Sequence, residues 1–158
     1  MQMRFDGHLG FPGGCADPGE DAVDALNREM SEESSRAVRL RVCDGDRVVS
    51  HWSPDKRLLL HFFALEVTPD RLARIERGVL AAHDFGGEVL GTVRVPLFTM
   101  SDGYRGFPSF LRNQFIGNSR QQLLHGLVAK GIMTKEEIRE ALSAQPVFFD
   151  GSKEAVAS

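Results

Sequence analysis

Three glutamates lie close together in the sequence, shortly after a glycine-rich turn. Glu29, Glu32 and Glu33 fall within five residues of one another, on one face of a helix that the apolar spacing predicts over 21–34. Acidic side chains at this spacing destabilise an isolated helix by roughly 0.2–0.5 kcal/mol per pair, so a bound cation would explain why they are gathered there. Carboxylate oxygens are ligands of Mg²⁺ and Mn²⁺, which also bind phosphate oxygens. The cluster is therefore suited to metal-assisted attack of water on a phosphoanhydride, with a glutamate accepting the proton. The alternative is a solvated helix face, which most acidic runs are.

The turn before this helix reads Phe11-Pro12-Gly13-Gly14. Two glycines after a proline predict a tight, irregular turn with backbone carbonyls at hand and space for a diphosphate to approach. The Phe11 ring could stack on a purine, or it could belong to the core.

The elements that would position these residues alternate between strands and helices. Strands are predicted over 1–5, 37–43, 46–52, 57–67 and from 88 to Pro96, with hairpin turns at Asp6-Gly7 and Asp44-Gly45. Besides the helix over 21–34, helices are predicted over 69–81, within 107–130 and over 134–143. Thr68-Pro69 and the capping box from Thr134 to Glu137 mark two of the helix starts. This mixture indicates an α/β or α+β class with a mixed sheet.

Length and composition indicate one ordinary globular domain, which we place at 1–145, followed by a polar tail over 146–158. The net charge of −3 argues against a protein that binds nucleic acid over its whole surface, although a local basic stripe is compatible with it. The two cysteines have neither zinc-ligand spacing nor a disulfide framework, which fits a reducing compartment. No apolar run approaches the length of a membrane span, so no membrane partner is expected.

The glutamate cluster belongs to a longer spacing pattern. Gly14 is followed after five residues by Glu20, and after seven more by Arg28-Glu29-Met30-Ser31-Glu32-Glu33. This stretch resembles the Nudix box, G-x5-E-x7-R-E-U-x-E-E-x-G-U, except that Ser34-Ser35-Arg36 stands where the box ends in x-G-U. Further blocks, MQMRFDG-LGFPGG, D-LNRE, EVLG-VRVPL and GFPSFL–N-FIG, resemble the Nudix 16 family from residue 1 to about Leu142.

The resemblance implies an α/β/α Nudix sandwich with a mixed sheet, and a chain that begins after the family's first core strand and its base-contacting histidine. It implies a homodimeric enzyme that is located in the nucleolus and nucleoplasm. An additional cytoplasmic location is left open. Such an enzyme would use Mg²⁺ or Mn²⁺ to cleave capped RNA, purine (inosine-type) nucleoside diphosphates, or both. By the same resemblance the metal ligands are the Gly13 carbonyl, Glu29, Glu32, Glu33, Glu88 and His51. Arg4, Phe11 and Gln122 would contact the substrate.

Each residue outside the glutamate cluster has a plainer interpretation. Glu88 could be an exposed loop residue, His51 a structural histidine beside an apolar strand, Arg4 a strand-face arginine. Gln122 could simply face solvent from its helix. The alternative for the whole chain is a non-catalytic Nudix-like module that binds RNA or protein. The family includes a catalytically inactive relative that binds a chromatin protein and has lost its box glutamates, whereas this chain retains them. The residues therefore favour catalysis.

Overall fold

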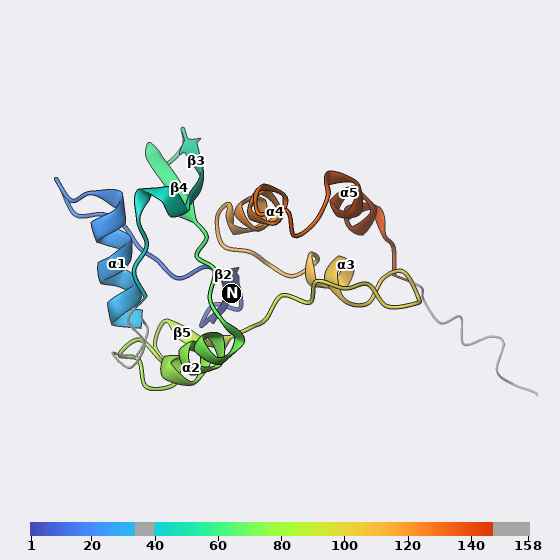
Figure 1. Ribbon diagram of the computed structural model, residues 1–158, viewed down its shortest axis with the longest axis horizontal. Helices are drawn as coiled ribbons and strands as arrows, with labels where there is room; N and C mark the ends of the chain where they lie inside the picture. The colour runs from blue at the N-terminus through green and yellow to red at the C-terminus, as the bar shows by residue number, and fades with distance from the viewer. Residues whose placement is uncertain (34–39, 147–158) are drawn as a thin grey trace, which may run out of the picture.

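The computed structural model describes residues 1–33 and 40–146, which form an α/β fold (Figure 1). One antiparallel sheet has the order β2-β1-β5 and consists of β1 (Gln2–Arg4), β2 (Leu9–Gly10) and β5 (Val89–Thr92). A second sheet is the hairpin of β3 (Arg47–Ser53) and β4 (Leu58–Phe63), preceded by a 3₁₀ turn η1 (Asp44–Asp46). The helices are α1 (Ala22–Glu33), α2 (Pro69–Val79), α3 (Phe107–Phe110), α4 (Ser119–Ala129) and α5 (Lys135–Ser143).

The β3–β4 hairpin lies between α1 and α4, so that helices cover both of its sides (Figure 1). α4 packs on β3, and α1 lines a common cavity with β4. α2 packs on β5, and α3 packs on α5. The α/β/α arrangement that the family resemblance implied is therefore confirmed.

The first hairpin forms where Asp6-Gly7 predicted it. Gly7 has φ +82°, a backbone conformation that favours glycine, and its N–H donates to the Arg4 carbonyl at 3.0 Å. The Asp6 carboxylate accepts from the His8 N–H at 3.0 Å, which closes the turn. The hairpin brings Leu9 and the residues after it back beside β1.

The main core lies among β2 and the C-terminal helices. Its buried members are Leu9, Phe107, Phe110, Leu111, Leu123, Leu127, Ile138 and Ala141. Burying a large apolar side chain contributes about 1.5–3 kcal/mol, so this cluster anchors α4 to β2. The Leu9 N–H donates to the Gln114 carbonyl at 2.8 Å, and the Leu9 carbonyl accepts from Ile116 at 3.0 Å. The glycine turn that follows β2 is thereby held beside the start of α4.

Two helices begin with the capping residues that the sequence predicted. The Thr68 hydroxyl accepts from the Arg71 N–H ahead of α2, with Pro69 in the first turn. At α5, Thr134 and Glu137 form the reciprocal capping box.

The predicted strand over 37–43 is wrong where it can be seen: residues 40–43 form no strand, and 37–39 lie outside the described residues. The Val42 N–H donates to Asn27 Oδ1 at 2.9 Å, and the Val42 carbonyl accepts from Asn27 Nδ2 at 3.1 Å. The amide of α1 thus satisfies both backbone groups, and no sheet partner is needed. Asp44-Gly45 accordingly lies in a 3₁₀ turn before β3 and not in a hairpin.

Other boundaries are shorter than predicted. β4 ends at Phe63 and not at 67, and β5 ends at Thr92, ahead of Pro96. The region 107–130 contains α3 and α4, and between them Gly117 adopts φ +53°. The described strands pair antiparallel, and parallel pairing occurs in isolated bridges such as Leu9–Phe115. The end of the predicted first helix, the departure at Ser34-Ser35-Arg36 and the tail from 147 lie outside the described residues.

None of the helices in the described part of the chain has the length and apolarity to cross a membrane.

Candidate active site

Arg28 connects the glycine turn to α1. Its Nε and Nη2 donate to the two oxygens of Glu20 at 3.1 and 3.0 Å, a bidentate pair. Its Nη1 donates to Glu29 Oε1 at 2.9 Å, and its Nη2 also reaches the Cys15 carbonyl at 3.3 Å. One guanidinium therefore fixes the loop, the approach to the helix and the Glu29 carboxylate together.

The same contacts shift the ionisation of the pair. The hydrogen bonds from Arg28, and secondarily one from the Asp17 N–H, lower the pKa of Glu20 below its ordinary value. Bonds to Glu20 and then to Glu29 raise the pKa of Arg28. Both partners are therefore charged at neutral pH.

The Glu29 carboxylate lies directly against the backbone of Gly14. A Cβ built on Gly14 would lie 2.4 Å from Glu29 Cδ and 2.5 and 2.6 Å from its two oxygens. A side chain at this position would have to displace the Glu29 carboxylate, which explains the glycine at this place of the pattern. Arg28 bonds Oε1, and within the described part of the chain Oε2 has no hydrogen-bond partner. A carboxylate with one fixed and one available oxygen suits a metal ligand.

Glu32 and Glu33 occupy the last turn of α1, three and four residues after Glu29. This backbone spacing puts them on the side of the helix that carries Glu29. Among the side chains that the structure describes, no three His, Cys, Asp or Glu residues gather into a metal-binding group. The hard oxygen donors present, with Glu29 cradled on Gly14, fit Mg²⁺ or Mn²⁺.

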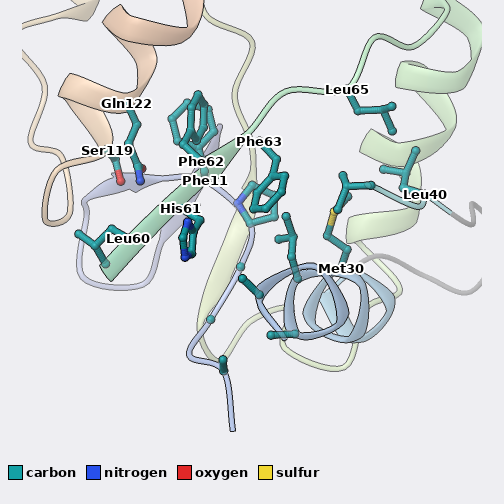
Figure 2. Close-up of a pocket in the computed structure, with 18 of the residues that line it drawn as sticks. Phe11, Met30, Leu40, Leu60, His61, Phe62, Phe63, Leu65, Ser119 and Gln122 are labelled. Carbon is teal, nitrogen blue, oxygen red and sulfur yellow. The ribbon is translucent and has the colours of Figure 1, made fainter. Parts of the chain in front are cut away.

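A cavity of about 450 Å³ lies between the glycine turn, α1, β4 and the start of α4 (Figure 2). Gly13 and Gly14 line it on the side of the turn, and α1 contributes Ala22, Ala25, Leu26 and Met30. The Phe11 ring packs against Phe62 at a centroid distance of 4.7 Å. Gln122 and Ser119 project from α4 beside these rings (Figure 2). The space is largely apolar, with a few polar groups at one end, as in sites that bind an organic ring.

Apart from Glu32 and Glu33, whose side chains lie outside the described part of the chain, the sequence-predicted residues divide into two sets. Phe11, Gly13 and Gln122 line the cavity, and Glu29 adjoins it through Gly14. Arg4, His51 and Glu88 do not line it.

The side chains of these three residues have different surroundings. Arg4 of β1 packs its side chain on Gly10 of β2 and lies 3.7 Å from the Asp6 carboxylate. The His51 ring makes an edge contact with His125 of α4, 5.1 Å between centroids, and its buried Nδ1 has no hydrogen-bond partner in the described residues. Glu88 is exposed just before β5, where its carbonyl accepts from the Phe5 N–H.

Sequence reasoning missed the histidine of the cavity, His61. It stands in the otherwise apolar strand LLLHFF, lines the cavity, and forms a 2.7 Å hydrogen bond through Nδ1 with the Ser50 hydroxyl. The signal for this residue in the sequence was a single histidine within an apolar strand. Its partner became visible only through the register of the β3–β4 hairpin, which pairs Ser50 with His61.

Comparisons with known proteins show which family the chain resembles. The model of the Nudt16-like family, described as U8 snoRNA-decapping enzyme-like, matches residues 1–133. A U8 snoRNA-decapping enzyme of Homalodisca vitripennis is 59% identical over 112 residues, which are 70% of this chain and 60% of that protein. The Bos taurus enzyme of the same name is 47% identical over 84% of this chain and 69% of its own.

A Tudor-interacting repair regulator protein of Homo sapiens is also similar, at 40% identity over 91% of this chain and 68% of that protein. The chain thus spans between about 60% and 70% of the length of these relatives.

Proposed function

The chain belongs to the Nudt16-like family, and from that premise we propose that it is a metal-dependent hydrolase of phosphoanhydride bonds. The substrates we propose are capped RNA, purine nucleoside diphosphates of the inosine type, or both. The observation that carries the proposal is the Glu29 carboxylate, which Arg28 holds against Gly14 at the wall of an aromatic cavity. This arrangement joins a hard-cation ligand to a site for a nucleobase.

The catalytic glutamates would act from one helix. Glu29, Glu32 and Glu33 of α1, with the Gly13 carbonyl, would hold Mg²⁺ or Mn²⁺, and Glu88 and His51 complete the proposed ligand set. The bound cations would neutralise the phosphates and lower the pKa of the attacking water. Arg28 orients Glu29, and one of the three glutamates accepts the proton that the water loses as it attacks phosphorus.

The cavity would bind the base. Phe11, supported by Phe62, offers an aromatic face on which a purine can stack. The Gln122 amide at the start of α4 offers both a donor and an acceptor to the edge of the base. Arg4 would contact phosphate, since its planar fork suits that group.

Names of the relatives support capped RNA as the substrate, and a nuclear location with it. We extend the proposal to a homodimer. Exposed apolar residues on the β3–β4 hairpin, Trp52, Leu58 and Leu59, are compatible with a subunit contact there.

The second candidate function is a non-catalytic module that binds RNA or protein, which the similarity to Tudor-interacting repair regulator proteins supports. Two observations favour catalysis: the relatives named decapping enzymes reach higher identity, and the box glutamates are retained.

Product analysis separates the two functions. The chain is incubated with Mn²⁺ and either a capped RNA or inosine diphosphate, and the products are identified by mass spectrometry. Release of a cap nucleotide or of inosine monophosphate is the expected result. Binding of RNA with no product from either substrate would establish the module instead.

A further inference from the structure

His61 and Ser50 form a polar pair at the edge of the apolar cavity. Because Ser50 and His61 are directly paired in the β3–β4 register, their side chains lie on the same face of the hairpin. Ser50 is exposed and His61 is half-buried, so the pair lies where the cavity meets solvent. The 2.7 Å bond to the Ser50 hydroxyl fixes the plane of the imidazole ring through Nδ1.

Strand alternation places His61 on the side of α1. Successive residues of β4 point to opposite faces, so His61 and Phe63 share one face and Phe62 occupies the other. Phe62 packs on α4, since a Cβ on Gly126 would lie 2.9 Å from its ring. His61 therefore faces the helix that carries Glu29, and Figure 2 shows its ring on the α1 side of β4, with Phe62 and Gln122 on the other side of the strand.

The remaining ring nitrogen is available to a ligand. Across the described residues, Nε2 of His61 has no hydrogen-bond partner, whereas Nδ1 is occupied by Ser50. When the Ser50 hydroxyl donates to Nδ1, the neutral ring must carry its proton on Nε2. An N–H donor would then stand in the cavity wall on the α1 side of β4. A diphosphate that reached from Phe11 and Gln122 toward Glu29 would come within range of this wall.

We propose that His61, oriented by Ser50, is a substrate-binding residue whose Nε2–H donates to a phosphate oxygen of the bound nucleotide. The inference rests on the proposed hydrolase function and adds a phosphate contact to it. His61 binds the phosphate chain, and Ser50 is a positioning residue that acts through the imidazole. Neither residue transfers a proton in the reaction.

The test compares His61→Ala, His61→Gln and Ser50→Ala with the unaltered full chain, using inosine diphosphate and Mn²⁺. Loss of a hydrogen bond to a charged group predicts a KM for His61→Ala raised about 10- to 100-fold, with a much smaller change in kcat. His61→Gln retains an N–H donor and should recover part of the affinity. Ser50→Ala should raise KM less than His61→Ala. The control is His83→Ala, a highly exposed histidine beside Asp84, which should leave both constants unchanged.

Competition with inosine, which has no phosphate, separates the phosphate contact from a base contact. His61→Ala should leave the inhibition constant of inosine unchanged. An equal loss of affinity for inosine and inosine diphosphate would overturn the phosphate assignment, and so would an unchanged KM. If the unaltered chain neither binds nor hydrolyses the diphosphate, the proposed function itself fails and this inference fails with it. If the unaltered chain is active but His61→Ala leaves KM unchanged, only the inference about His61 is refuted and the proposed function stands.

Discussion

Replacing Gly14 with alanine should inactivate the protein while leaving it folded. The added Cβ would lie 2.4 Å from Glu29 Cδ, whereas carbon atoms in ordinary contact are about 3.5 Å apart. The carboxylate must therefore retreat by about 1 Å, which lengthens or breaks its 2.9 Å bond to Arg28. Gly14 has no left-handed backbone conformation, and the atoms it would meet end a flexible side chain, so the fold can absorb the change. We expect a loss of stability of about 1 kcal/mol or less.

Turnover should fall far more, because displacing a catalytic group by about 1 Å can cost about 100-fold in rate. The assay is Mn²⁺-dependent hydrolysis of inosine diphosphate, with thermal melting followed by circular dichroism. Gly45→Ala is the matched control, since its Cβ would meet only the Cys43 sulfur at 3.6 Å. Because both changes act on one carboxylate, adding Gly14→Ala to Glu29→Gln should cause little further loss. A folded Gly14→Ala protein with normal turnover would refute the role given to this contact.

Three further predictions concern the cavity and the loop. Gln122→Ala should reduce the preference for inosine over uridine diphosphate by about tenfold, the equivalent of one hydrogen bond, with Mn²⁺ affinity unchanged in calorimetric titrations. Equal binding of both nucleotides by the unaltered chain would exclude Gln122 from base recognition. Arg28→Lys should lower kcat by about tenfold and also lower the melting temperature, since one ammonium cannot bond both Glu20 and Glu29 in a planar fork. Unaltered kcat would show that Glu29 needs no such support. Because the pKa of Glu20 is lowered in the folded state, its contribution to stability is complete above its unfolded pKa and is lost as the pH falls through the folded one. Melting temperatures measured from pH 6 to 3 should therefore fall less steeply in Glu20→Gln than in the exposed-site control Glu66→Gln, and parallel curves would contradict this.

The features that sequence predicted best are those fixed by neighbouring residues. The Asp6-Gly7 hairpin and the caps at Thr68 and Thr134 depend on atoms within about four residues, and each forms as expected. The contacts of Gly14, Glu20, Arg28 and Glu29 follow from a fixed spacing along one loop and helix. The spacing singled out these four residues, but it did not predict that Arg28 would bond Glu20 and Glu29 or that Glu29 would rest on Gly14.

Features that depend on distant contacts could not be predicted in this way. Val42 bonds to Asn27 fifteen residues away, and this tertiary pairing replaces the expected strand. His61 joins the cavity only through the register of a hairpin, which single-strand patterns do not specify. His51 was expected from the resemblance to be near a metal, and its role stays a prediction, since the structure places it against His125.

The most direct test of the central claim is the rate of Mn²⁺-dependent hydrolysis of capped RNA by the unaltered chain and by Glu33→Gln. We predict that Glu33→Gln lowers turnover at saturating Mn²⁺ by about 100-fold or more, because a principal metal-binding carboxylate is lost. Its melting curve should be unchanged. Glu66→Gln, made on an exposed residue that does not itself line the cavity, should retain full turnover. Near-normal turnover of Glu33→Gln would contradict the assignment of the glutamate helix as the catalytic metal site.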